Sequence, residues 1–273
     1  MGERDRFVSA DGTVITYEVH GSGGPALVVV PGGTRAAHHY TAMATSLGGK
    51  LTVYALNRRG RCGSGPQRDG HTVEDDCADV AALMKLSGAR FLFGHSYGGL
   101  VALETVLRHH GAAAKLALYE PAIAAREPLP LEWVPDYERA LSRGRHGEAM
   151  IRMIKGLRVG GPLNHVPTPL LTPLIGLMMR GEDGREWREL AGTLPAEIRA
   201  VQRLDATVAR YRETETETLL MKGDRSPGYL REAVDALAVT LPHARAETLT
   251  GVGHNAPDQD APAKVADLLA TFF

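Results

Sequence analysis

Short apolar runs recur along the chain, separated by segments of helical length. The runs lie at 26–30, 51–56, 91–93, 116–119, 218–222 and 245–249. Runs of this length without polar alternation are typical of parallel strands that are buried on both faces. The intervening predicted helices lie at 36–47, 73–87, 97–109, 229–240 and 261–273. This alternation predicts an α/β protein with a mostly parallel central sheet and helices on both faces.

Two regions depart from the alternation. In residues 7–20, two β-rich runs flank Asp11-Gly12, a dipeptide that favours a hairpin turn, so we expect an antiparallel ribbon there. From 121 to 212, proline and glycine interrupt short helical patterns, and we predict no core strand. We therefore predict a core made of residues 1–120 and 213–273, with a helical cap inserted at 121–212.

Composition narrows the class of partner. The 273 residues include 31 basic and 32 acidic side chains, for a formal net charge of -1 at pH 7. This balance, without a basic cluster, argues against nucleic acid or a membrane surface as a partner. The charged N-terminus lacks a signal pattern, and no apolar run approaches the ~20 residues that span a bilayer, so we expect a cytoplasmic protein. With only Cys62 and Cys77, a four-thiolate zinc site is excluded, and both are expected to be free thiols.

The pentapeptide Gly94-His95-Ser96-Tyr97-Gly98 follows an apolar strand and opens a predicted helix. This strand–turn–helix setting favours a nucleophile elbow over an ordinary glycine-rich turn. Glycine at positions 94 and 98 would let the strand and helix backbones approach closely, while a strained turn projects the serine hydroxyl. We therefore predict that Ser96 is a nucleophile.

A serine nucleophile needs a base and donors for the oxyanion that forms during acyl transfer. His254 follows the last predicted strand and precedes the last helix, where a loop reaches the same edge of the sheet as Ser96. The backbone amides of Tyr97 and Gly33 are the expected oxyanion donors, because Gly33 lies in the loop after the first parallel strand. A plain glycine turn is the alternative for that loop.

These segments together resemble the α/β-hydrolase superfamily. The resemblance rests on the hairpin, Pro31-Gly32-Gly33, Asn57-Arg58-Arg59-Gly60-Arg61-Cys62-Gly63-Ser64-Gly65, Gly94-His95-Ser96-Tyr97-Gly98-Gly99 and Gly253-His254. It covers nearly the whole chain outside the predicted cap and implies the α/β-hydrolase fold. Loop 57–65 is similar to the family's Asp-x-Arg-Gly-x-Gly-x-Ser turn, with Asn57 in place of Asp, and is expected to have a structural role.

The acid that orients the histidine has two candidates. In this family it usually follows the strand after the cap, three residues beyond a glycine, where this chain has Ser226, with Asp224 two residues earlier. Other members, haloalkane dehalogenases among them, carry the acid at the end of the preceding core strand, where this chain has Glu120. We favour Glu120, because it ends an apolar strand at the edge where such sheets bind ligands, and Asp224 is the alternative. A salt bridge to the cap is the structural alternative for Glu120.

These residues predict a serine hydrolase that cleaves a carboxylic ester, lactone or thioester through an acyl-enzyme on Ser96, with His254 as general base. The expected partner is a small molecule with a hydrophobic acyl group, and no cofactor or metal is expected. His38 and His39 are expected to line the pocket. The alternatives are a non-hydrolytic enzyme of the same fold, such as a lyase, an acyl-transferring cyclase or a haloperoxidase-like enzyme, and a catalytically weak ligand-binding protein.

Overall fold

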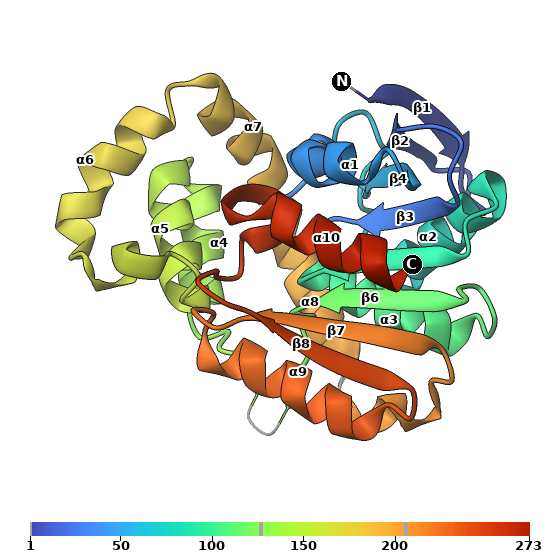
Figure 1. The fold of residues 1–273 in the computed structure, drawn as a ribbon. Helices are drawn as coiled ribbons and strands as arrows, with labels where there is room; N and C mark the ends of the chain where they lie inside the picture. Colours follow the sequence, from blue (N-terminus) through green and yellow to red (C-terminus); the bar gives the residue numbers. More distant parts are fainter. Residues whose placement is uncertain (1, 126–127, 205–206) are drawn as a thin grey trace.

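An eight-stranded sheet forms the centre of the molecule (Figure 1). The computed structural model describes residues 2–125, 128–204 and 207–273. The strands are β1 (Glu3–Val8), β2 (Val14–His20), β3 (Ala26–Val30), β4 (Thr52–Asn57), β5 (Phe91–His95), β6 (Lys115–Tyr119), β7 (Glu217–Gly223) and β8 (Ala244–Leu249). They lie in the order β1-β2-β4-β3-β5-β6-β7-β8. The β1–β2 hairpin and the β2–β4 pair are antiparallel, and all other neighbours are parallel, which confirms the predicted fold class.

Alternate residues of each central strand face different helical layers, which explains the uninterrupted apolar runs in the sequence. In β3, Val28 and Val30 pack on one layer, whereas Leu27 and Val29 pack on the other, and all four are fully buried. The first layer contains α2 (Val73–Ser87), α3 (Tyr97–Arg108) and α9 (Gly228–Thr240), and the second contains α1 (Thr41–Leu47) and α10 (Pro262–Phe272).

The order of the strands opens a crevice beside β3. The chain adds β4 on one side of β3 and then β5 on the other, so the segments that follow β3 and β5 diverge. Parallel sheets bind ligands at such a point, beyond the carboxyl ends of the strands. The segment after β3 carries Gly33 and the segment after β5 carries Ser96, so the topology brings these two predicted site residues to one place.

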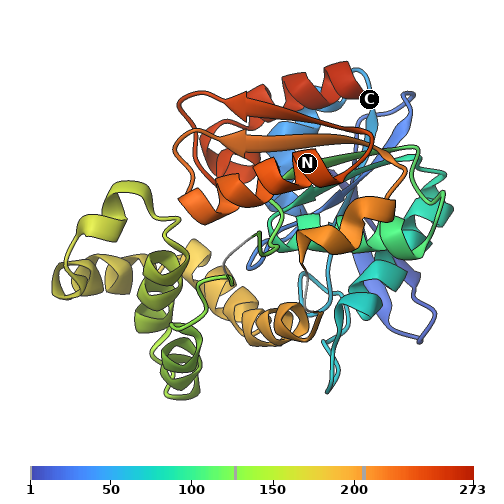
Figure 2. The same cartoon turned by 90° about the horizontal axis from the view of Figure 1, so that it is seen from below.

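Between β6 and β7 the described residues form helices rather than core strands. We call this group the helical insertion: α4 (Val134–Ser142), α5 (His146–Leu157), α6 (Thr168–Met178), α7 (Glu182–Ala191) and α8 (Leu194–Leu204). Figure 2 shows the insertion projecting to one side of the sheet. Most of its buried apolar side chains, including Tyr137, Ile151 and Leu171, form a cluster separate from the two clusters that flank the sheet, although Ala200 of α8 belongs to one of those two. The cap boundaries at 121 and 212 stay a prediction, and residues 126–127 and 205–206 of that range lie outside the described part of the chain.

The helix predicted at 36–47 is divided in two. A short 3₁₀ helix, η1 (Ala37–Tyr40), precedes α1. The side-chain oxygen Oδ1 of Asn57 accepts a hydrogen bond of 2.9 Å from the Ala37 amide and ties this first turn to the end of β4. Asn57 therefore has the structural role expected of its loop. None of the helices in the described ranges is both long and apolar enough to cross a bilayer.

Candidate active site

Ser96 occupies a strained turn between β5 and α3. Its φ of 55° and ψ of −121° lie outside the regions that residues with side chains prefer. The glycines on either side allow this turn to sit close to its neighbours: a Cβ at Gly98 would lie 2.2 Å from the Val30 carbonyl oxygen, and a Cβ at Gly94 would lie 2.4 Å from the Gly98 carbonyl oxygen. Because no other residue fits at these two positions, the sequence holds Ser96 at the edge of the sheet, where it lines a cavity.

Glu120 lies against His254. Its Oε2 is 2.7 Å from His254 Nδ1, and Glu120 is completely buried. A carboxylate accepts hydrogen bonds, so Nδ1 carries the proton and Nε2 of the neutral ring is left as an acceptor. Asp224, the alternative acid, is exposed and accepts a hydrogen bond of 2.8 Å from the Gly251 amide instead. Within the described residues, Asp224 makes no hydrogen bond to His254.

The end of β6 is shaped to present Glu120. The backbone of Glu120 has a φ of 44°, an unfavourable value for a residue with a side chain. Two hydrogen bonds to β7 maintain it: the Glu120 amide donates to the Met221 carbonyl oxygen at 3.1 Å, and Glu120 Oε1 accepts from the Gly223 amide at 2.7 Å. Both carboxylate oxygens are therefore engaged, and the side chain has one orientation toward His254.

The predicted oxyanion donors border the same cavity as Ser96. Gly33 and Tyr97 both line it. Among the described residues, no acceptor takes the backbone amide of either. Tyr97 is the first residue of α3, whose opening amides have no partner within the helix. The Ser96 hydroxyl likewise makes no hydrogen bond within the described residues, and hydrogen bonds between a nucleophile and its base are often long before substrate binds.

His95 connects three segments of the site, a role that sequence reasoning missed. Its Nε2 lies 2.9 Å from the His254 carbonyl oxygen, so Nε2 carries the proton, and Nδ1 accepts from the Tyr40 hydroxyl at 2.7 Å. The Tyr40 oxygen in turn accepts the Gly32 amide at 3.0 Å. Burial holds the pKa of His95 well below its usual range, so the ring stays neutral. The chain of contacts fixes the loops of Gly32, Ser96 and His254 relative to one another.

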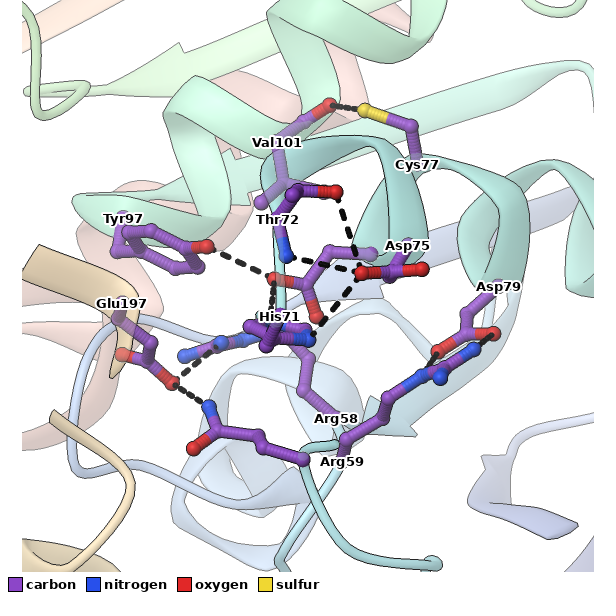
Figure 3. Close-up of polar contacts among 12 residues, drawn as sticks. Arg58, Arg59, His71, Thr72, Asp75, Cys77, Asp79, Tyr97, Val101 and Glu197 are labelled. Atoms are coloured by element: carbon purple, nitrogen blue, oxygen red, sulfur yellow. Dashed lines mark hydrogen bonds and ion pairs between the residues drawn. The ribbon is translucent and has the colours of Figure 1, made fainter. Parts of the chain in front are cut away.

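A buried ionic cluster of Arg58, Arg61 and Glu197 joins the core to the helical insertion, and Figure 3 shows its Arg58 and Glu197. Glu197, from α8, accepts a hydrogen bond of 2.7 Å from Arg58 Nη1 and a second from Arg61 Nη2 on the same oxygen. All three side chains are at most 1% exposed. Both arginines follow β4 in loop 57–65. The only sequence signal for this cluster is the run of arginines that directly follows a buried strand, since buried arginines require acidic partners.

His38 and His39 lie elsewhere than predicted. Neither lines the cavity. Instead, His38 Nε2 is 2.7 Å from Glu186 Oε1 of α7, and the ring of His39 lies 4.2 Å from that of His38. The division of the predicted helix after Tyr40 explains the error, because both histidines lie on η1 and face α7 across the insertion boundary.

His38, His39 and Glu186 are also the group of potential metal ligands in the described ranges, with ligand atoms within 4.8 Å of one another. Their hydrogen bonds do not suit a metal. The Ala36 amide donates to His39 Nδ1 at 3.1 Å, which places the ring proton on Nε2, the nitrogen that faces Glu186. That tautomer offers no lone pair toward the carboxylate. Burial also lowers the pKa of His39 to about 3, so the ring is neutral.

The cavity beside Ser96 has a volume of about 730 Å³. Ser96 and His254 lie on its core side. Its other walls are largely apolar and come from the helical insertion and the segment before it: Leu131, Trp133, Met150, Met153, Ile154, Leu157 and Ile198. The cavity thus has a polar wall at the sheet edge and apolar walls elsewhere, as in many small-molecule sites.

Comparison with known proteins fits this geometry. Residues 27–268 match the model of the Alpha/beta hydrolase family. The chain belongs to the alpha/beta hydrolase family. An alpha/beta hydrolase from Sphaerobacter thermophilus superposes with a TM-score of 0.81 at 30% identity, covering 98% of this chain and 100% of that one. An esterase from Exiguobacterium antarcticum gives a TM-score of 0.73 over 100% of this chain and 99% of that one, and its 18% identity supports the fold alone.

A sequence relative of this chain is N-formylmaleamate deformylase from Pseudomonas putida. It is 33% identical to this chain over 152 residues, which are 52% of this chain and 56% of that protein. The chain thus spans about half the length of the curated relatives it matches. The family and these relatives support hydrolase activity, while the bond that is cleaved is a matter of proposal.

Proposed function

We propose that this protein is a serine hydrolase that cleaves carboxylic esters, lactones or thioesters with an apolar acyl group. The observation that carries the proposal is the 2.7 Å contact between His254 Nδ1 and Glu120 Oε2, behind a cavity that Ser96 also lines. A buried carboxylate on Nδ1 prepares the other ring nitrogen to accept the proton of a serine hydroxyl.

In the acylation step, His254 Nε2 takes the proton from Ser96 Oγ as Oγ bonds to the substrate carbonyl carbon. The carbonyl oxygen becomes an oxyanion, and the amides of Gly33 and Tyr97 stabilise it. The buried negative charge of Glu120 stabilises the imidazolium that forms on His254. When the tetrahedral intermediate collapses, the bond to the leaving group breaks and His254 protonates the departing alcohol or thiol.

Deacylation repeats these roles with water as the nucleophile. His254 takes a proton from water, whose oxygen bonds to the acyl carbon, and the same two amides stabilise the second oxyanion. Collapse of this intermediate releases the carboxylic acid, and the proton returns from His254 to Ser96 Oγ. In both halves of the cycle, residues of the chain act as the base, the acid and the oxyanion donors.

The size and apolar walls of the cavity support a substrate with an apolar acyl group. A volume of about 730 Å³ exceeds what a small polar acid requires and lies in the range of drug-sized ligands. Burying each methylene stabilises a complex by about 0.8 kcal/mol. Selectivity for longer acyl chains should therefore rise by up to about fourfold per methylene until the cavity is filled.

The test is hydrolysis of p-nitrophenyl acetate, butyrate, hexanoate and octanoate by the wild type and by Ser96→Ala. We expect kcat/KM to rise with acyl length and Ser96→Ala to lose at least about 10³-fold. The matched p-nitroanilides, measured in parallel, should react far more slowly. Preferential hydrolysis of the anilides would replace the ester assignment by an amide one, and equal rates for the wild type and Ser96→Ala would overturn the proposal.

A further inference from the structure

Arg58 contacts both sides of the proposed oxyanion site, although sequence reasoning gave its loop only a structural role. It is 1% exposed. Its Nε donates to the Pro31 carbonyl oxygen at 3.0 Å, and its Nη2 donates to the Gly32 carbonyl oxygen at 2.8 Å. The third nitrogen of the planar guanidinium, Nη1, donates to Glu197 Oε1. A guanidinium that donates along three directions holds its acceptors in one geometry, unlike the compact ammonium of lysine.

The contact with Gly32 helps to set where the Gly33 amide points, together with a hydrogen bond of 3.3 Å from the Arg35 amide to the same carbonyl oxygen. The Gly32 carbonyl and the Gly33 N–H belong to one peptide plane, and this bond is trans, since the described chain contains no cis peptide. In a trans peptide the carbonyl and the N–H point in opposite directions. With the carbonyl held toward Arg58, the N–H of Gly33 points away from Arg58, and Gly33 lines the cavity.

We propose that Arg58 is a positioning residue for catalysis, which orients the Gly33 amide toward the oxyanion, and that Glu197 makes this orientation depend on the docking of α8. The inference rests on the proposed function. It extends that function by assigning the preorganisation of the oxyanion site to a side chain that does not touch substrate.

The second oxyanion residue lies against the same side chain. Arg58 Cζ is 4.6 Å from the centroid of the Tyr97 ring, and the Tyr97 hydroxyl donates to Asp76 Oδ2 at 2.8 Å. Arg58 thus packs against the ring at the start of α3 as well as the loop after β3. Burial opposes its charge, but the negative charges of Glu197 and Asp76 prevail and raise the pKa of Arg58. The positive charge therefore persists beside the place where the oxyanion forms.

Arg61 provides a matched control within the same cluster. It is equally buried and binds the same oxygen of Glu197, and its Nη1 donates to the Arg59 carbonyl oxygen at 3.0 Å. Within the described residues it makes no hydrogen bond to loop 31–33. Substituting either arginine by lysine disturbs the ionic cluster, but only the change at position 58 removes side-chain hydrogen bonds to the Pro31 and Gly32 carbonyl oxygens.

Glu197 extends the arrangement to the helical insertion. It lies on α8, whereas Arg58 follows β4 in the core, so the ion pair spans the boundary between the two parts. A Cβ at Gly33 would lie 3.2 Å from Leu194 of the same helix and 3.5 Å from Glu197 Oε2, so α8 packs directly on the loop. Movement of α8 away from the core would therefore remove both the acidic partner of Arg58 and the helix that packs on the loop.

The experiment compares Arg58→Lys with Arg61→Lys, using p-nitrophenyl hexanoate as substrate. We expect Arg58→Lys to lower kcat between about tenfold and a hundredfold with KM changed by less than threefold, because complete removal of one oxyanion donor costs about 10²–10³-fold. Arg61→Lys should lower kcat by less than threefold. An alkyl trifluoromethyl ketone, which forms a tetrahedral oxyanion adduct on serine, should lose affinity for Arg58→Lys by the same factor as kcat/KM.

Thermal unfolding of both variants verifies that they are folded. If Arg58→Lys does not fold, Arg58→Gln and Arg61→Gln are compared by the same criteria. Equal losses of kcat in the two variants, or a loss at position 58 that appears in KM alone, would overturn the inference while leaving the proposed function intact. A wild type without Ser96-dependent hydrolysis would overturn the proposed function, and the inference with it.

Discussion

The edge of the central sheet and the helical insertion border one cavity, but they contribute to it in different ways. At the sheet edge, polar groups are fixed by hydrogen bonds between strands and loops, as Glu120 is by Gly223 and His254. The insertion contributes apolar walls such as Met153 and Ile198, which belong to or pack against a separate apolar cluster. A buried ionic contact, Glu197 with Arg58, links the two parts.

We therefore expect the sheet edge to carry the catalytic groups and the insertion to determine which substrates are preferred. Hydrogen-bonded groups at strand ends have little freedom, which suits a reaction that requires fixed geometry. Apolar helix faces tolerate substitution of one aliphatic side chain by another and can change the shape of the cavity without moving the reacting groups. Changes at the sheet edge should therefore reduce the rate for every substrate, whereas changes in the insertion should alter the preference among substrates.

The largest effect is expected for the acid at the sheet edge. Glu120→Gln keeps the shape of the side chain but removes the charge and favours the wrong tautomer of His254, so kcat/KM for every ester should fall about 10³- to 10⁴-fold. In Asp224→Asn, at the alternative position, kcat/KM should fall by less than threefold. Steady-state kinetics on p-nitrophenyl butyrate would measure both, and a larger loss in Asp224→Asn than in Glu120→Gln would reverse the assignment of the acid.

An intermediate effect is expected in the insertion. Leu157 lines the cavity, whereas Leu170 of α6 is 65% exposed and does not. Leu157→Ala should lower kcat/KM for the octanoate ester about five- to tenfold relative to the acetate, because it removes apolar contacts to the distal part of the chain. In Leu170→Ala, the ratio of kcat/KM for the octanoate to kcat/KM for the acetate should equal that of the wild type. An equal loss of kcat/KM for both esters in Leu157→Ala would contradict the assignment of substrate preference to the insertion.

The smallest effect concerns pH and stability beside the ionic cluster. Burial lowers the pKa of His71, but Asp76, with Oδ2 at 3.0 Å from Nε2, outweighs it and raises the pKa above its usual value. A raised pKa in the folded state stabilises the fold below the unfolded pKa of about 6.5, and this stabilisation is lost as pH rises through the folded value.

Urea unfolding should therefore show a greater destabilisation by His71→Gln at pH 6 than at pH 8.5. The exposed His110, which makes no ion pair within the described residues, provides the control, since His110→Gln should show the same small change at both pH values. A destabilisation by His71→Gln that grows toward pH 8.5 would mean that the His71–Asp76 contact does not favour the charged imidazole.

Sequence reasoning succeeded where strands determine position. Apolar runs give the ends of parallel strands, and those ends meet at one edge, so Ser96, Gly33 and Glu120 could be placed near one another before their distances were known. The departure at Ser226 from the family's usual acid directed attention to Glu120, which the structure brings to 2.7 Å from His254. Its catalytic role stays a prediction.

Sequence reasoning failed where position depends on contacts distant in the chain. Arg58 and Glu197 are 139 residues apart, and no local pattern connects them. His95 neighbours Ser96 in the sequence, and no local pattern shows that its ring contacts the Tyr40 hydroxyl and the His254 carbonyl oxygen. The sequence predicts His38 and His39 at the pocket, but no pattern in it marks the break in their helix, where the Ala37 amide donates to Asn57 Oδ1.

The central claim is that Ser96 is a nucleophile activated by His254 and Glu120. Its most direct test is the mass of the intact protein and of its peptides after treatment with a fluorophosphonate. The account predicts one adduct, on the peptide that contains Ser96, absent in Ser96→Ala and formed far more slowly in His254→Ala and Glu120→Gln. Labelling of another residue, or labelling of Ser96 at an unchanged rate in His254→Ala, would contradict it.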